Sequence, residues 1–312
     1  MRMTVCGEAL IDLFQSPNPD ERLSSLGGSP LNTAVALGKV GESVSFLGRL
    51  GDDHYADELM THLETNGVDT SLVVRVSEPT SIANVTQLPG GMNEYEFDFA
   101  GTANFGWRRA DFPRSVGDWL HFGSLVYLVE PGASSFLRWV QKIDCQISVD
   151  LNIRPSVEPN RERYWGKVLQ VLSFVGSKQG IVKLSLDDLA WLIPGSADDL
   201  GSAITVLRDW LTEYGLNLIL LTLGDGGALA IQKIGKLTLV PGFQVEVVDT
   251  IGAGDTFMAG FLSIWLRGEQ DLTLALRYGN AAAALSCGRV GANPPTSEEV
   301  EEFLIAQVAE GD

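Results

Sequence analysis

The run LNLILLTLG, residues 216–224, decides the fold class of this chain. It is apolar at most positions up to its final glycine, which is the pattern of a strand buried on both faces. Similar short runs recur, most of them separated by ten or more residues with helical spacing; they are MTVCGEAL (3–10), SVSFLGRLG (43–51), WLHFGSL (119–125), CQISVDLN (145–152), GIVKLSL (180–186) and GALAIQKIG (227–235). Strands separated by helices imply right-handed crossovers and a mainly parallel sheet covered on both faces. The sequence therefore predicts an α/β protein.

One region breaks this alternation. Helices are expected at about 31–40 and 55–66, but residues 72–107 hold β-rich runs, a PGG turn and no helix-length pattern. Together with LIDLFQ (10–15) they predict a small antiparallel sheet inserted into one domain that spans the whole chain, 1–312. We interpret the insertion, 13–26 and 72–107, as a lid over a site; an edge extension or a dimer surface is the alternative.

The charge of the chain excludes some partners. Lys and Arg number 22 against 40 Asp and Glu, a net charge of −18, and a surface of that sign repels phosphate backbones and anionic membranes. We therefore expect no nucleic-acid or membrane partner. An acidic chain can still bind ATP where backbone amides, a helix N-terminus or a metal ion reverse the local field.

The cysteines and the N-terminus predict a cytoplasmic protein. Cys6, Cys145 and Cys287 are widely spaced and lie in or beside apolar stretches, as buried free thiols in a reducing compartment do. Glu8 and Asp12 come too early for a signal peptide, and no apolar run approaches the ~18 residues of a membrane span.

The stretch VDTIGAGDTF (248–257) has the composition of an anion site. Gly252, Ala253 and Gly254 leave backbone N–H groups unobstructed just before an apolar helical pattern, and exposed amides at a helix N-terminus bind anions. Asp255 is, on this local evidence, either the cap of that helix or a group that does chemistry. The stretch is neither a Walker P-loop nor a GxGxxG dinucleotide fingerprint.

The loop GGSPLNTAVALGKVG (27–41) suits a polyhydroxy ligand. Gly28 lets a ligand approach the backbone closely, and Asn32 offers a donor and an acceptor near a helix start. The alternative is an ordinary helix start with Asn32 near the cap.

Two further loops follow predicted strands. TLGDGGALA (222–230) either wraps a nucleotide or forms a hairpin. In VDLNIRP (149–155), Asp150, Asn152 and Arg154 alternate at a strand end, so three polar groups could point to one side and the arginine could clamp hydroxyls or a carboxylate. The alternative is an Asp–Arg pair with a proline ending the strand.

Two of these stretches together resemble the two signatures of the PfkB, or ribokinase-like, family of carbohydrate kinases. The N-terminal signature is matched by Gly27, Gly28, Pro30, Asn32, Ala34, Gly41 and Gly51, and the C-terminal one by Asp249-Thr250, Gly252-Ala253-Gly254-Asp255 and Ala259-Gly260. GEALIDLF, DLNIRP and KLS look most similar to fructokinases. The resemblance covers essentially the whole chain and implies a three-layer α/β/α fold with a mainly parallel central sheet and a small β-sheet lid.

The resemblance also implies roles for individual residues. Asp255 matches the general base that takes the proton of a sugar hydroxyl, and the amides of Gly252, Ala253, Gly254 and Asp255 match the anion hole. The other matching positions are Asp12, Gly28, Asn32 and Arg154 for the sugar, and Ser185, Thr222, Gly224, Gly227 and Asn280 for ATP.

Cations follow from the same resemblance. Mg²⁺ is expected on the ATP phosphates. The family commonly has Asn and Glu where this chain has Ser185 and Asp188, and we expect the shorter Asp188 carboxylate to reach the metal through water. K⁺ is suggested near the loop of Asp249, because many relatives bind a monovalent cation there.

Fructose is the expected substrate, followed by 2-keto-3-deoxygluconate and then by ribose or a nucleoside. An arginine near the substrate tail would favour the acid by charge pairing, whereas a ketose needs hydrogen bonds alone. The non-enzymatic alternative is a protein that senses a sugar or nucleotide without turnover. Relatives use the edge of the β insertion to form dimers, which makes a homodimer a further possibility.

Overall fold

The computed structural model describes residues 1–14, 23–87, 93–233, 237–268 and 271–309. Its large sheet has eight strands in the order β14-β13-β12-β11-β10-β9-β1-β4. The strands are β1 (Met3–Cys6), β4 (Val44–Leu47), β9 (Trp119–Gly123), β10 (Gln146–Asp150), β11 (Ile181–Ser185), β12 (Leu218–Thr222), β13 (Ala228–Gln232) and β14 (Leu237–Val240). All pairs from β4 to β12 are parallel, and β13 and β14 add antiparallel pairs at one edge, which confirms the mainly parallel sheet.

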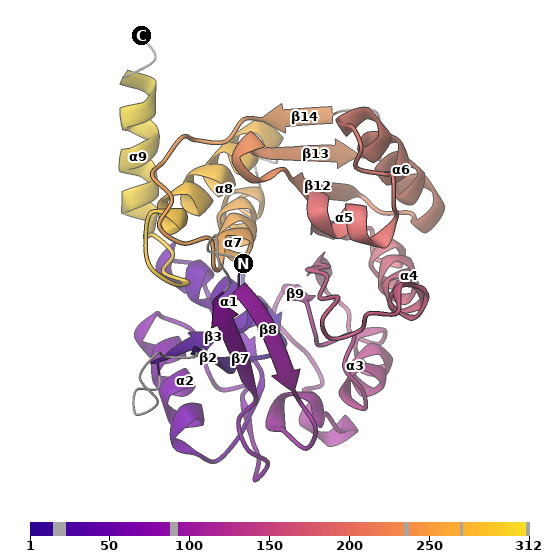
Figure 1. The fold of residues 1–312 in the computed structure, drawn as a ribbon, viewed down its shortest axis with the longest axis vertical. Helices are drawn as coiled ribbons and strands as arrows, with labels where there is room; N and C mark the ends of the chain where they lie inside the picture. Colours follow the sequence, from indigo (N-terminus) through magenta and orange to yellow (C-terminus); the bar gives the residue numbers. More distant parts are fainter. Residues whose placement is uncertain (15–22, 88–92, 234–236, 269–270, 310–312) are drawn as a thin grey trace.

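Helices cover both faces of this sheet (Figure 1). They are α1 (Ser29–Lys39), α2 (His54–Thr65), α3 (Gly132–Val140), α4 (Arg161–Ser177), α5 (Leu186–Leu192), α6 (Leu200–Tyr214), α7 (Ala253–Trp265), α8 (Leu272–Cys287) and α9 (Ser297–Ala309), with short 3-10 turns η1 (Ala103–Phe105), η2 (Arg109–Asp111) and η3 (Gly224–Gly226). Leu218 and Leu220 pack in the apolar cluster of α1, α2, α7 and α8, whereas Ile219 and Leu221 pack in that of α3, α4 and α6. β12, within residues 216–224, is therefore buried on both faces, and the fold has the three predicted layers.

The two expected helices lie within two residues of their predicted bounds. The first begins at Ser29 because Pro30 fits the first turn of a helix, where its missing N–H has no intrahelical acceptor. The second begins after Asp53, whose Oδ1 accepts a hydrogen bond from the backbone N–H of Ala56 at 2.9 Å.

The inserted sheet has four strands in the order β3-β2-β7-β8: β2 (Leu10–Phe14), β3 (Leu23–Gly27), β7 (Ile82–Gln87) and β8 (Asn93–Asp98). The prediction that it is antiparallel is wrong for one pair, since β2 and β7 run parallel. About seventy residues separate these two strands, so no tight turn imposes an antiparallel direction on them. The central β2–β7 pair is flanked by antiparallel partners on both sides.

Figure 1 shows this small sheet grouped near α1 and α2, while α9 projects from the body. A separate two-stranded sheet pairs β5 (Arg49–Leu50) with β6 (Val74–Arg75). The PGG turn and part of the predicted lid segment 13–26 lie outside the described residues. The lid role, the dimer surface and the division into domains stay predictions. Among the helices described, none is long and apolar enough to cross a membrane.

Candidate active site

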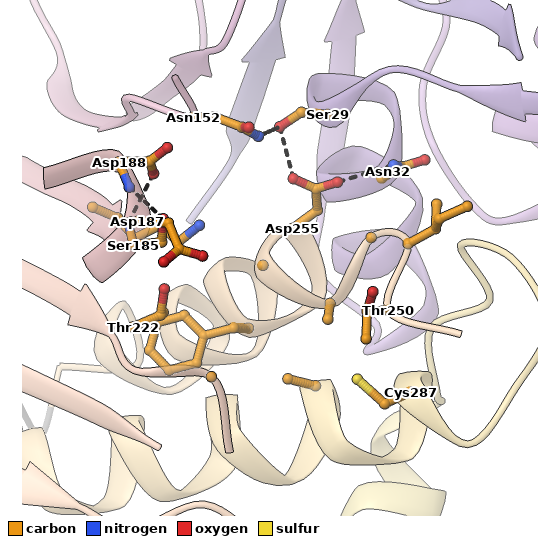
Figure 2. A pocket seen from close by; sticks show the side chains of 18 of the residues that line it. Ser29, Asn32, Asn152, Ser185, Asp187, Asp188, Thr222, Thr250, Asp255 and Cys287 are labelled. Carbon is orange, nitrogen blue, oxygen red and sulfur yellow. Dashed lines mark hydrogen bonds between the residues drawn. The ribbon is translucent and has the colours of Figure 1, made fainter. Parts of the chain in front are cut away.

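A cavity of about 1240 Å³ lies at the carboxyl ends of the parallel strands, where open α/β sheets bind their ligands. Figure 2 shows part of its lining. Fourteen predicted site residues line it: Asp12, Gly28, Asn32, Arg154, Ser185, Asp188, Thr222, Gly224, Gly227, Gly252, Ala253, Gly254, Asp255 and Asn280. Asp249 is not part of this lining. The fold thus gathers loops from both halves of the sequence around one cavity.

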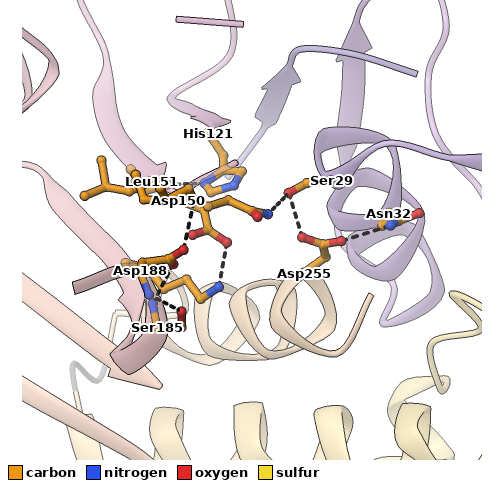
Figure 3. Close-up of polar contacts among 12 residues, drawn as sticks. Ser29, Asn32, His121, Asp150, Leu151, Ser185, Asp188 and Asp255 are labelled. Carbon is orange, nitrogen blue, oxygen red and sulfur yellow. Dashed lines mark hydrogen bonds and ion pairs between the residues drawn. The ribbon is translucent and has the colours of Figure 1, made fainter. Parts of the chain in front are cut away.

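Asp255 is held by side chains from α1. Its Oδ1 accepts a hydrogen bond from Ser29 Oγ at 2.7 Å, and its Oδ2 accepts one from Asn32 Nδ2 at 2.9 Å (Figures 2 and 3). The interpretation of Asp255 as the helix cap is wrong, because the N-cap of α7 is Gly252 and makes no side-chain cap bond. Gly28 is the N-cap of α1, and Asn32 lies near it in the first turn, where its side chain contacts Asp255.

Asp255 is buried, with 5% of the residue exposed, and this burial has the largest effect on the pKa of its carboxyl group. Desolvation raises the pKa of this carboxyl above its ordinary value, while the hydrogen bonds from Ser29 and Asn32 and the charges of Lys183 and Arg154 oppose the rise. A carboxylate that is buried, oriented and more basic than usual is suited to accept a proton.

Close contacts surround the glycines at the start of α7. Gly252 has a φ of 75°, and a Cβ there would lie 2.9 Å from Ala292 Cβ. A Cβ on Gly254 would lie 2.9 Å from the ammonium nitrogen of Lys183. The first turn of a helix leaves backbone N–H groups without intrahelical acceptors, and here that turn lines the cavity. It offers a site for an anion.

Lys183 is a cavity residue that the sequence analysis did not single out. Its Nζ donates to Asp150 Oδ2 at 2.6 Å, and the two side chains are 5% and 2% exposed. Burial lowers the pKa of Lys183, but Asp150, Asp188 and Asp255 outweigh that effect, so its pKa is raised and the ammonium stays charged. The sequence could have indicated this residue, because Lys183 stands two positions before Ser185 and therefore lies on the same face of β11.

The predicted arrangement of 149–155 is wrong in two respects. Asp150 pairs with Lys183 rather than with Arg154. The strand also ends at Asp150, and Asn152 adopts a left-handed φ of 40°, so the three polar residues do not alternate along a strand. Asn152 instead donates to Ser29 Oγ at 2.8 Å and so supports the hydroxyl that contacts Asp255.

Two carboxyl groups and one guanidinium lie at another part of the cavity wall. Asp12 is 7% exposed and Glu8, which the sequence analysis did not assign to the site, is 2% exposed. Burial raises the pKa of each to about 7, and the charge of Arg154 opposes both shifts. Gly28, with a φ of 112°, runs so close to this region that a Cβ would lie 2.6 Å from the Glu8 carbonyl oxygen.

The glycine loop 222–230 is a hairpin, and it also lines the cavity. β12 and β13 pair antiparallel on either side of η3. A Cβ on Gly227 would lie 2.2 Å from the Val240 carbonyl oxygen, so the loop packs closely on the end of β14. Asn280 also contacts the end of β14: its Nδ2 donates to Val240 O at 3.0 Å and to Pro241 O at 3.1 Å.

The two predicted cation ligands are engaged by backbone amides. Asp188 accepts from Ser185 N at 2.8 Å and from Ile153 N at 2.9 Å, and with Ser185 it forms a capping box for α5. Asp249 accepts from Ile251 N at 3.0 Å and from Gly291 N at 2.9 Å. In the part of the chain that the structure describes, no group of three or more His, Cys, Asp or Glu could hold a metal ion by itself.

Known proteins resemble this chain over most of its length. The sequence model of the pfkB family of carbohydrate kinases matches residues 4–299 of this chain. A fructokinase of Rhizobium leguminosarum bv. trifolii is 34% identical over 270 residues, 83% of this chain and 78% of that protein. The crystal structure of fructokinase with bound ATP from Xylella fastidiosa has a TM-score of 0.85 and 28% identity, covering 98% of this chain and 99% of that one. The structure of a fructokinase double mutant from Vibrio cholerae O395, in fructose, ADP and potassium ion bound form, has a TM-score of 0.83 at 23% identity. It covers 97% of this chain and 98% of that one.

Proposed function

The chain belongs to the pfkB family of carbohydrate kinases, and on that premise we propose that it transfers the γ-phosphate of ATP to a primary hydroxyl of fructose, with Asp255 as the general base. By its family it is a sugar phosphotransferase. One observation carries the proposal: the buried Asp255 carboxylate is oriented by Ser29 and Asn32 inside the same cavity that the first turn of α7 lines.

The residues supply the parts that phosphoryl transfer needs. The substrate hydroxyl gives its proton to Asp255 as its oxygen attacks the γ-phosphorus and the bond to the ADP oxygen breaks. The amides at the start of α7, with Lys183 beside Gly254, stabilise the charge on the transferring oxygens. We call Lys183 and Gly252–Asp255 the phosphate end of the cavity.

We propose Mg²⁺ and K⁺ as cofactors because the cavity and the loop of Asp249 offer the oxygen ligands that these cations prefer. Mg²⁺, when bound, neutralises charge on the ATP phosphates. Asp187 and Asp188 line the cavity at the start of α5, and carboxylate oxygens that already accept one amide hydrogen bond keep a lone pair for a metal-bound water. Asp249 would support K⁺ indirectly, by fixing the loop whose carbonyl oxygens are the ligands that K⁺ prefers. A relative whose structure holds a potassium ion supports K⁺ as a ligand.

The charge at the other end of the cavity favours a neutral sugar. We call Glu8, Asp12 and Arg154 the sugar end. The charge of Arg154 lowers the pKa of both carboxyl groups, so part of its field is directed at them as well as at a substrate. With pKa values of about 7, these two side chains are partly ionised near neutral pH, and their ionised forms would repel an anionic acid such as 2-keto-3-deoxygluconate while accepting hydrogen bonds from the hydroxyls of fructose.

A coupled ADP-release assay tests this proposal. Fructose, ribose, 2-keto-3-deoxygluconate and a nucleoside are compared as acceptors at saturating ATP and Mg²⁺, with Asp255→Asn as the inactive control. We expect the highest kcat/KM with fructose, by about tenfold or more over the acid. A higher value with the acid would overturn the substrate assignment. Binding without turnover of any acceptor would instead support the sensing protein.

A further inference from the structure

Asn152 has a backbone conformation that the surrounding chain imposes. Its φ of 40° is left-handed, a region that is uncommon for residues other than glycine, although Asn enters it more readily than most. The backbone on both sides is fixed, since Leu151 N donates to Lys183 O at 2.9 Å and Ile153 N donates to Asp188 Oδ1 at 2.9 Å. Strained conformations persist only where the surrounding structure determines them, and they cluster at functional sites. Here the strain fixes the direction in which the Asn152 side chain leaves the backbone.

The Asn152 amide begins a chain of hydrogen bonds that ends on Asp255. Its Nδ2 donates to Ser29 Oγ at 2.8 Å, and Ser29 Oγ donates to Asp255 Oδ1 at 2.7 Å (Figure 2). An amide NH₂ group only donates, so the Ser29 oxygen accepts from Asn152 and its single proton is left for Asp255. The other carboxylate oxygen accepts from Asn32 Nδ2 at 2.9 Å. Each oxygen of Asp255 thus receives one donor from the protein and keeps a further acceptor site for a substrate hydroxyl.

These bonds join three segments that are far apart in the sequence. Asn152 follows β10, Ser29 is the first residue of α1, and Asp255 lies in the first turn of α7. The bonds from Asn152 to Ser29 and from Ser29 to Asp255 are both partly buried, so water competes with them less than at the surface. The chain of bonds therefore sets where the Asp255 carboxylate lies relative to the other walls of the cavity.

We propose that Asn152 is a positioning residue for phosphoryl transfer, because it holds the Ser29 hydroxyl as a donor to Asp255 and so fixes the orientation of the base. It acts through Ser29 and not by contact with the sugar or with ATP. The inference rests on the proposed function, since it assumes that Asp255 takes the substrate proton. Without the Asn152 amide the Ser29 hydroxyl is free to rotate toward other acceptors, and a base that is less well oriented accepts the proton less efficiently.

A double-mutant cycle tests whether Asn152 acts through Ser29. Asn152→Gly removes the amide and tolerates the left-handed φ, and Ser29→Ala removes the hydroxyl. Each single variant should lower kcat by about tenfold while KM for ATP stays unchanged. The double variant should also lose about tenfold rather than about 10²-fold, because the first substitution already abolishes the interaction that the second removes. Additive losses, a wild-type kcat in Asn152→Gly, or a rise in KM for the sugar alone would overturn the proposal.

The pH profile of kcat gives a readout that a purely structural role would not move. The hydrogen bond from Ser29 lowers the pKa of Asp255, so its loss should raise that pKa and shift the acid limb of the profile to higher pH in Asn152→Gly and in Ser29→Ala. Three charged groups also act on Asp255 and are the same in every variant: Lys183, Arg154 and Asp150. An acid limb that stays in place in Asn152→Gly would contradict the proposed role.

Gln179→Gly is the matched control. Gln179 has the same left-handed conformation, with a φ of 52°, but it is exposed and lies outside the cavity lining. Its kcat and pH profile should equal those of the wild type. Asn152→Asp keeps the size of the side chain but replaces the donor by an acceptor, so it should lower kcat at least as far as Asn152→Gly. It gives the same readout if the glycine variant does not fold, and a wild-type kcat in Asn152→Asp would overturn the proposal.

Asp255→Asn distinguishes this inference from the proposed function. If Asp255→Asn keeps the wild-type kcat, the assignment of the base fails, and the positioning role of Asn152 fails with it. If Asp255→Asn is inactive but the losses in Asn152→Gly and Ser29→Ala are additive, the base stands and the positioning role alone is overturned. If the wild type prefers a sugar other than fructose, the same cycle is run with the preferred sugar and is judged by the same outcomes.

Discussion

The phosphate end of the cavity presents helix-start amides and the ammonium of Lys183, whereas the sugar end presents the carboxyl groups of Glu8 and Asp12 together with Arg154, whose charge lowers the pKa of both. The difference explains how a chain with a net charge of −18 can be suited to bind ATP. The local amides and the ammonium of Lys183, which is paired with Asp150 on its other side, act on a bound phosphate at short range, whereas the surface charge is screened.

Removal of the base should give the largest effect, and it should be confined to the phosphate end. We expect Asp255→Asn to lower kcat by ~10²-fold or more, because the proton acceptor is lost while Ser29 and Asn32 still surround a side chain of the same size. The dissociation constant of ATP, measured by calorimetry, should stay nearly unchanged. A wild-type kcat would show that Asp255 is not the base.

Removal of the buried cation comes next. Lys183→Met should lower kcat by about 10- to 10²-fold, because one positive charge beside the transferring oxygens is lost. The single variant also leaves Asp150 unpaired, so it is compared with Lys183→Met/Asp150→Asn, which removes both charges of the pair. Recovery of Tm together with recovery of kcat in the double variant would mean that Lys183 acts on stability alone.

At the sugar end, Arg154→Ala should change the binding of the sugar rather than the chemical step. We expect KM for the sugar to rise by about tenfold while KM for ATP is unaltered, since the arginine lines the cavity with Glu8 and Asp12. Steady-state kinetics with each substrate varied in turn measure both values. Equal losses for sugar and ATP would indicate general structural damage and would remove the distinction between the two ends.

The smallest expected effect concerns stability and pH. Glu8 has a pKa raised to about 7 by burial, so the folded state binds its proton more tightly than the unfolded state, whose pKa is near 4.5. Its contribution to stability is thus greatest below pH 4.5 and is lost as the pH rises to about 7. Glu8→Gln should therefore flatten the fall in unfolding free energy from pH 5 to pH 8, by an amount on the order of 1 kcal/mol.

Denaturant titrations at several pH values measure this flattening, with Glu42→Gln, the same change at a half-buried glutamate outside the cavity lining, as the matched control. Parallel stability curves for the wild type and Glu8→Gln would show that the Glu8 carboxyl is not shifted in the folded protein. That result would also weaken the charge argument for a neutral sugar.

The two ends differ in how far the sequence predicts them. Gly252–Asp255 are neighbours in one local motif, and helix geometry alone places their amides together, so this group could be predicted before the fold was known. Asp255 stayed ambiguous because its partners Ser29 and Asn32 are more than 220 residues away along the chain. Glu8 and Lys183 were missed for the same reason, since their neighbours come from other strands and loops.

By itself, the sequence determined the α/β class, the parallel strands and the glycine-rich helix start that we propose as an anion site, because apolar periodicity and glycine placement act over a few residues. The tertiary structure alone decided that Asp150 pairs with Lys183, that Asp188 caps α5, that β2 and β7 run parallel and that Glu8 faces the cavity. Each of these depends on which distant segments the sheet brings together, and ion pairs, amide hydrogen bonds and desolvation are set by those neighbours rather than by spacing along the chain.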